Sequence, residues 1–119
     1  MQDLAGALKA LGEPTRLRIV CLLAIKTLCV CQLMEILDLS QPKISRHLGV
    51  LKQAKLVECT KQAQWSWYST SKHPLLKTVF PLAGQSDQAI RDRERMESLD
   101  LDLLCENPVI TIGRSNDND

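Results

Sequence analysis

Aromatic side chains are scarce in this chain of 119 residues, at 3% of the sequence, and long apolar runs are missing. A core with so few rings has to be built from Leu and Ile, which favours helices over a large sheet. No apolar segment is long enough to cross a bilayer. The N-terminus also lacks the basic start and apolar stretch of a signal peptide. We therefore expect a cytoplasmic protein with no membrane partner.

Features of common catalytic sites are absent as well. The chain has two histidines, no Ser/His/Asp arrangement and no phosphate-binding loop, so we do not expect an enzyme. Its five cysteines, at positions 21, 29, 31, 59 and 105, are an odd number in what should be a reducing compartment. That count favours metal binding or redox chemistry over a disulfide framework.

The charge is unevenly distributed, although the net charge is only +1. Residues 1–40 are balanced, with four basic and four acidic side chains, whereas residues 41–84 carry seven basic and one acidic. Residues 85–119 are acidic, with nine acidic and four basic side chains. A basic segment between a neutral and an acidic one creates a local positive field, which suits a polyanionic partner.

Hydrophobic periodicity predicts the order of the elements. Apolar residues at helical spacing predict helices over 2–12, 14–25, about 30–37 and 41–54. Two alternating runs, 56–60 and 65–70, predict a hairpin, and its 61–64 connection lacks Gly and Asn and should exceed a two-residue turn. Residues 74–104 look helical again, with Pro81 able to kink or divide them and a sparse apolar stripe suited to a second subunit. We predict a mainly α domain with a small β-hairpin over 1–105, a winged helix-turn-helix, followed by a disordered tail over 106–119.

The helix expected over 41–54 has the properties of a DNA-reading helix, which would lie in the major groove. Gln41 can pair with adenine, and Arg46 can pair bidentately with guanine. Lys43 and Ser45 can contact bases or phosphates. His47 borders the buried stripe, so both a DNA contact and a packing role stay open. On the hairpin, contacts to the DNA backbone or minor groove are expected from Lys61, Gln62 and Gln64.

Cys29 and Cys31 form a Cys-Val-Cys unit directly before the helix-turn-helix. Thiolates bind soft ions, such as zinc, cadmium, lead, and trivalent arsenic or antimony. Residues i and i+2 of a regular helix point to different sides, whereas in extended chain they can face the same way. One ion bound by both cysteines should therefore distort the start of the third helix and change the angle of the reading helix. This interpretation makes the thiolates an allosteric switch.

The runs LCVCQL, LSQPKISRHLGVLKQAKLV and WSWYST resemble the ArsR/SmtB family of metal-responsive repressors, and within it the arsenical-resistance repressors most closely. The resemblance covers roughly residues 4–80. It implies a homodimer that represses its own resistance operon and needs no obligatory cofactor. It also implies that binding of As(III) or Sb(III) to Cys29 and Cys31 releases the protein from double-stranded operator DNA. The recognition helix would then contain residues 41–47.

The sequence departs from this pattern at the ligands. Met34 stands where such repressors often have a third cysteine. The third ligand is therefore open between Cys105 or Cys59, from the same or the other subunit, an external thiol, or none. No Cys precedes Cys21, which counts against the cadmium and lead sensors that add N-terminal cysteines, and residues 75–105 contain no His, which excludes the family's zinc site. Three alternatives stay open: a thiol-redox or reactive-sulfur sensor that uses a distant cysteine pair, a Cd/Pb-responsive repressor, and a protein-interaction module with no DNA role.

Overall fold

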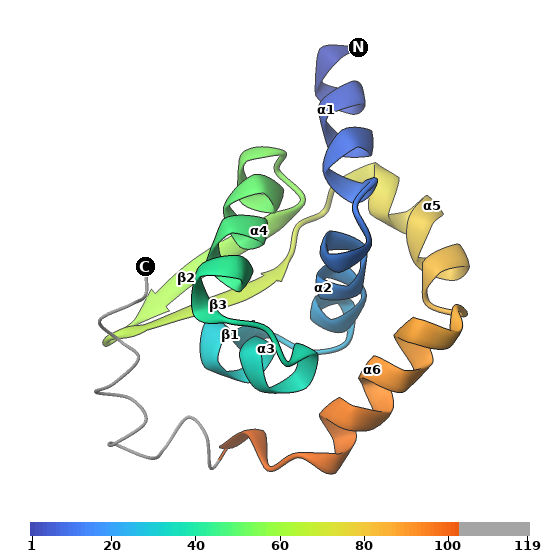
Figure 1. Cartoon of the computed structure of the whole chain (residues 1–119). Helices are drawn as coiled ribbons and strands as arrows, with labels where there is room; N and C mark the ends of the chain where they lie inside the picture. Colours follow the sequence, from blue (N-terminus) through green and yellow to red (C-terminus); the bar gives the residue numbers. More distant parts are fainter. Residues whose placement is uncertain (103–119) are drawn as a thin grey trace.

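The computed structural model describes residues 1–102, which form helices and a small antiparallel sheet whose hairpin extends to one side (Figure 1). In chain order the elements are α1 (Gln2–Leu11), α2 (Pro14–Ile25), β1 (Leu28–Cys29), α3 (Val30–Leu37), α4 (Gln41–Gln53), β2 (Val57–Gln62), β3 (Trp65–Thr70), α5 (Pro74–Ala83) and α6 (Asp87–Ser98). The predicted fold class, mainly α with a β-hairpin in a winged helix-turn-helix, is confirmed. The predicted tail over 106–119 lies outside the described residues.

Helix α2 is the centre of the molecule. The Glu13 side chain caps it by accepting a hydrogen bond from the Arg16 backbone N–H at 3.0 Å, and Pro14 opens its first turn. The helix contacts α1, α4, α5, α6 and β3. The side chains that it buries are Ile19, Val20, Leu22 and Leu23. These aliphatic side chains form the middle of the hydrophobic core, and the other helices pack around α2.

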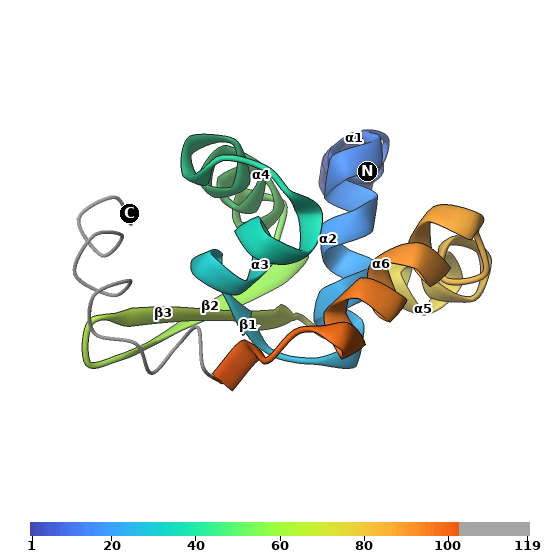
Figure 2. The same cartoon turned by 60° about the horizontal axis from the view of Figure 1, so that its bottom comes forward.

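The sheet has three antiparallel strands in the order β1-β3-β2, and its hairpin extends beyond the helices (Figures 1 and 2). Strands β2 and β3 correspond to the two predicted strands. Strand β1 was not predicted, because two residues are too few to show an alternating pattern. Its residues Leu28 and Cys29 lie opposite Tyr68 and Trp67 of β3. The Cys-Val-Cys unit is therefore tied to the sheet as well as to α3.

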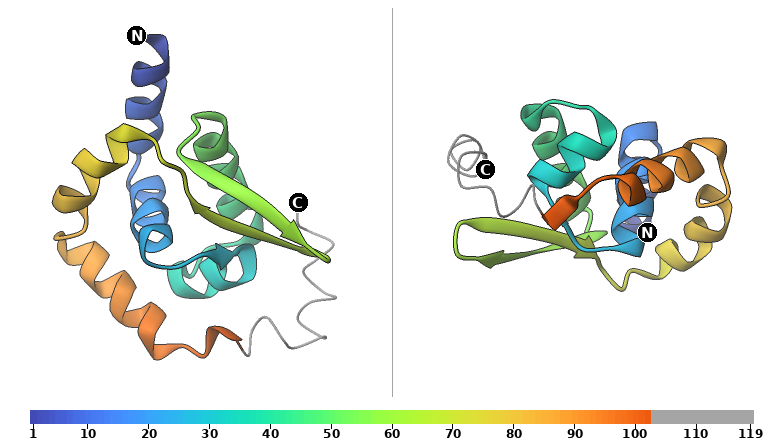
Figure 3. Two further views of the ribbon diagram at one scale, coloured as in Figure 1. Left: turned by 180° about the vertical axis from the view of Figure 1, so that it is seen from behind. Right: turned by 90° about the horizontal axis from the view of Figure 1, so that it is seen from below.

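The hairpin turn differs from the prediction of a longer loop. Gln62 lies opposite Trp65, so only Ala63 and Gln64 connect the strands at the tip, which Figure 3 shows far from the helices. Ala63 adopts a φ of 55°, a left-handed conformation that costs an alanine about 1–2 kcal/mol. The prediction was wrong because pairing along six residues of β2 outweighs this local strain.

The division of the C-terminal helical region also lies elsewhere than Pro81. That proline is inside α5, and the break falls at residues 84–86. At Gly84 an added Cβ would lie 2.9 Å from the backbone oxygen of Phe80, so a larger residue would disturb this helix end. Ser86 then caps α6, with its side chain accepting a hydrogen bond from the Ala89 N–H at 3.2 Å. Cap chemistry, rather than proline, decides the boundary.

Helix α6 folds back along α2 and α3. Its apolar residues Ala89 and Met96 are buried within the chain, so part of the stripe expected to face a second subunit is used internally. Arg18 of α2 donates two hydrogen bonds to the buried Asp92, at 2.9 and 3.0 Å. Within residues 1–102, none of the helices is both long and apolar enough to cross a membrane.

Candidate nucleic-acid interface and thiolate site

Helix α4, the predicted reading helix, begins at Gln41 and buries its apolar stripe as its sequence predicts. The Ser40 side chain caps it by accepting a hydrogen bond from the Lys43 backbone N–H at 3.4 Å. Its inner side is anchored by Ile44, Leu48 and Leu51, each at most 1% exposed. Helix α3 ends at Asp38, whose φ of 56° starts a short turn into α4. One side of α4 is thus packed into the core, and its other side is exposed.

The free side of α4 carries most of the predicted DNA-contacting residues. Lys43 and Arg46 are exposed. Gln41 and Ser45, one turn apart, are joined by a hydrogen bond from Gln41 Nε2 to Ser45 Oγ at 2.7 Å. This bond orients the Gln41 amide before any partner arrives. The side chains that the sequence proposed for base and phosphate contacts therefore lie on one accessible surface, although the DNA contacts themselves stay predictions.

His47 differs from these four residues because only 9% of it is exposed. Its Nδ1 lies 3.3 Å from Nη1 of Arg16, and a guanidinium can only donate, so Nδ1 accepts. Arg16 also donates from Nε to the Ala10 backbone oxygen at 2.6 Å. Burial lowers the pKa of His47, while the Glu13 carboxylate opposes that shift. The packing role that the sequence left open is the one that this position favours.

Arg16 was missed as a functional residue. Through its contacts with Ala10 and His47 it links the end of α1 to the reading helix. No sequence pattern indicates this contact, because Arg16 and His47 are 31 positions apart. The pair joins α4 to the central helix.

Cys29 and Cys31 lie on either side of the start of α3. Cys29 is the N-cap residue, with extended backbone (φ −99°, ψ 173°), and is 1% exposed. Cys31 is the second residue of the helix and is half-buried. Since Cys29 already lies outside the helix, an ion bridging the two sulfurs would need less unwinding than the sequence suggested. The distortion would fall on the cap of α3.

Gln32 holds this cap and was also missed. Its side-chain oxygen accepts a hydrogen bond from the Cys29 N–H at 3.1 Å, and its Nε2 donates to the Leu101 oxygen at 3.2 Å. Gln32 is only 2% exposed, and it forms a capping box with Cys29. The sequence signal was a Gln three positions after an N-cap, but cysteine is not a usual capping residue. Any movement of Cys29 must strain this buried amide.

The third ligand is not provided by the described residues. Within residues 1–102, His, Cys, Asp and Glu form no cluster of three that could hold a metal ion. Cys59 lies opposite Tyr68, the neighbour of Trp67, so its side chain is on the sheet face opposite to that of Cys29. Cys59 of the same chain is thereby ruled out as a ligand beside Cys29. Cys105 lies outside the described residues.

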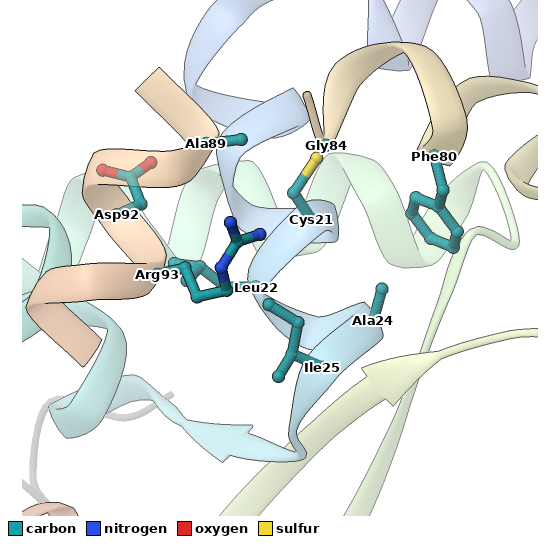
Figure 4. Close-up of a pocket in the computed structure, with 9 residues that line it drawn as sticks. All are labelled: Cys21, Leu22, Ala24, Ile25, Phe80, Gly84, Ala89, Asp92 and Arg93. Carbon is teal, nitrogen blue, oxygen red and sulfur yellow. The ribbon is translucent and has the colours of Figure 1, made fainter. Parts of the chain in front are cut away.

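Cys21 lies apart from this site, in α2, beside a cavity of about 180 Å³ between α2, α5 and α6. In Figure 4 its sulfur lies toward Gly84, while Asp92 and Arg93 line the cavity from α6. Burial raises the pKa of the Cys21 thiol, and the Asp92 carboxylate adds to the rise. The Cys21 side chain is half-buried rather than enclosed in the core.

Comparisons with known proteins agree with this geometry. The family model described as "Bacterial regulatory protein, arsR family" matches residues 13–58. The arsenical resistance operon repressor of Escherichia coli K12 is 50% identical over 66 residues, which cover 55% of this chain and 56% of that protein. The arsenic resistance transcriptional regulator ArsR2 of Pseudomonas putida is 37% identical over 92 residues, covering 70% of this chain and 80% of that protein. Reduced HlyU from Vibrio cholerae superposes with a TM-score of 0.64 at 33% identity, over 71% of this chain and 87% of that one.

Proposed function

Because the chain belongs to the ArsR family of bacterial regulatory proteins, we propose that it is a cytoplasmic transcriptional repressor whose inducer is trivalent arsenic or antimony. The inducer binds the thiolates of Cys29 and Cys31, and binding lowers the affinity of the protein for operator DNA. The proposal draws on relatives named as arsenical or arsenic resistance repressors and regulators. The matched part of this chain spans little more than half of the Escherichia coli repressor.

One observation carries the proposal: Cys29 is the N-cap of the first helix of the helix-turn-helix. Helix α3 packs against α4, so its start cannot move without changing how α4 is held. Two thiolates two residues apart bind a soft ion only if their sulfurs turn toward one another. That rotation competes with the Cys29–Gln32 capping box, and this competition couples inducer binding to the position of α4.

The DNA-binding surface consists of the free side of α4 and the hairpin, or wing. On α4 it comprises Gln41, Lys43, Ser45 and Arg46, and His47 braces the helix from behind. On the wing it comprises the exposed Lys61, Gln62 and Gln64. The basic charge of residues 41–84 supplies the attraction to phosphates that all DNA binding needs.

A homodimer would place two such surfaces on a two-fold symmetric operator. Apolar side chains remain exposed at Leu4 and Leu8 of α1, at 43% and 52%, and at Leu82 of α5, at 77%. Both helices lie toward the same end of the molecule in Figure 1. An apolar surface of this kind is usually covered in a stable assembly. We assign it to the subunit interface, with reading helices spaced about one DNA turn apart, ~34 Å.

The test is release from DNA, measured by fluorescence anisotropy on a labelled duplex from upstream of the protein's own gene. Arsenite, antimonite, cadmium, lead and zinc are titrated in turn under reducing conditions. Release by arsenite or antimonite supports the proposal, whereas release by cadmium or lead alone would identify a divalent-ion sensor. Cys29→Ser with Cys31→Ser should keep DNA binding and lose the response. Cys59→Ser, on the other face of the sheet, is the matched control.

A thiol-redox repressor is the second candidate, favoured by the likeness to HlyU solved in a reduced form. It would need a distant cysteine pair, and Cys21 beside its cavity is the available first member. The raised pKa of Cys21 argues against it, because the thiolate is the reactive form. Free-thiol titration before and after a mild oxidant separates the two: loss of two thiols together with DNA release would establish the redox function.

A further inference from the structure

The strand that carries Cys29 is hydrogen-bonded to the wing. Cys29 lies directly opposite Trp67 in the β1–β3 pair, and Trp67 lies opposite Thr60 of β2 on its other side. Residues directly opposite one another in an antiparallel pair have Cβ atoms about 5 Å apart. Trp67 is therefore the wing residue nearest to the inducer-binding thiol across the sheet.

The two side chains also share a face. Successive residues of a strand point to opposite faces, and the neighbouring pair, Leu28 and Tyr68, packs with the hydrophobic core. Cys29 and Trp67 accordingly lie on the other face. Cys29 is only 1% exposed, and Trp67 is its direct cross-strand partner on this face.

We propose that Trp67 forms one wall of the inducer site and that inducer binding at Cys29 is transmitted to the wing through the β1–β3 pair. This inference rests on the proposed function, because it assumes that Cys29 binds the inducer. It adds a second route to the one through α3 and α4. DNA release then involves loss of wing contacts together with a change in the reading helix.

The short length of β1 explains why inducer binding at Cys29 would shift the wing. Strand β1 has only two residues, so a small rotation of Cys29 toward Cys31 changes one of its two residue pairs. From Trp67 to Gln64 in the turn is three residues, or ~10 Å of extended strand. The exposed Lys61 and Gln64 belong to the same paired hairpin as Trp67, so a shift at Trp67 would pass to them along the strands.

Trp65 provides an internal control. It lies on the same face as Trp67, two residues closer to the turn, and is opposite Gln62 rather than Cys29. The two rings are in contact, with centroids 6.5 Å apart and planes tilted by 46°. The chain has just these two tryptophans, so Trp65→Phe and Trp67→Phe each leave a single fluorescent reporter.

The first experiment titrates arsenite into both single-tryptophan proteins under reducing conditions. The protein that retains Trp67 should change its emission at the arsenite concentrations that release the operator, and the protein that retains Trp65 should change much less. Equal emission changes in both proteins, or release without any change at Trp67, would overturn the inference and leave the proposed function standing. If wild type neither releases DNA nor binds arsenite, the proposed function fails, and this inference fails with it.

The second experiment measures transmission to the wing. Lys61→Ala removes an exposed charge from the wing, and Lys43→Ala removes one from α4. Both should weaken operator binding, but Lys61→Ala should also shrink the arsenite-induced change in operator Kd, by about twofold or more. Lys43→Ala should shrink it less than Lys61→Ala does. An arsenite effect that Lys61→Ala leaves unchanged would show that the wing does not take part in release.

Discussion

Asp92→Ala should destabilise the protein more than any other single charge removal on α6. The Asp92 side chain is 5% exposed and accepts two hydrogen bonds from Arg18 and a third from Gln88 Nε2 at 3.0 Å. The two bonds from Arg18 join α6 to the central helix, whereas the bond from Gln88 lies within α6. The hydrogen bond with Asp92 raises the pKa of Arg18. Without Asp92 the guanidinium still stays charged, because arginine is not deprotonated in proteins.

The loss of stability depends on the charge of Arg18, which remains without a partner when Asp92 is removed. Breaking a buried ion pair by removing one partner costs about 3–5 kcal/mol, because the other charge is left uncompensated. The Arg18 side chain is 27% exposed and regains some water, which places Asp92→Ala near the lower limit, at about 3 kcal/mol. For a chain of this length, 1 kcal/mol corresponds to a Tm change of roughly 3–5 °C. A decrease of roughly 10 °C is therefore expected.

Urea unfolding and thermal melts at one protomer concentration measure this change, since dimerisation would otherwise alter the apparent stability. The control is Glu35→Ala, which removes an ion pair with Arg95 that is 3.9 Å long and has both side chains about half exposed. It should cost about 0.5 kcal/mol. Arg18→Met combined with Asp92→Leu should recover most of the loss, since it leaves no unpaired charge. An Asp92→Ala variant as stable as Glu35→Ala would refute the reasoning.

Three further outcomes are expected. Arg46→Ala should weaken specific operator binding by ~1–3 kcal/mol in an anisotropy titration, and unchanged affinity, matched by Lys77→Ala on α5, would reject α4 as the reading helix. Because burial holds the pKa of His47 below its ordinary value of about 6.5, the unfolded chain takes up the proton first. Stability in urea should therefore be full above that pH and decline as the pH falls below it, and His47→Gln should decline less. Ala63→Gly should raise the free energy of unfolding by about 0.5 kcal/mol by relieving the positive φ, whereas Gln64→Gly should bring no gain.

Most of the helical framework was predictable because its signals are local. The caps Glu13 and Ser40, the prolines in the first turns of α2 and α4, and the apolar stripe of α4 all lie within one or two turns of what they specify. Strand β1 was not predictable in this way. Its partner Trp67 is far along the chain, and pairing over two residues leaves no periodic trace.

The candidate site likewise has one part that local sequence signals predict and another part that depends on tertiary packing. The candidate functional residues Cys29, Cys31 and Arg46 are visible in the sequence, whereas the groups that position their helices are not. Arg16 contacts His47 only after α2 and α4 pack together. Gln32 reaches Leu101 across 69 positions. Positioning contacts of this kind depend on tertiary structure, so a motif can indicate which atoms react without indicating what holds them.

The energetics of release favour a switch that acts through more than one contact. Moving a repressor from almost fully bound to almost fully free takes about 5.5 kcal/mol of difference in inducer affinity between the two states. A single coupled pair of sites typically supplies about 1–3 kcal/mol. If, as we propose, a dimer carries two thiolate sites that are each coupled to DNA binding, together they supply about 2–6 kcal/mol, and the upper end of that range meets the requirement. Linkage then demands that operator DNA weaken inducer binding by the same factor, so a cell would need enough inducer to overcome the DNA-bound state before the operon opens.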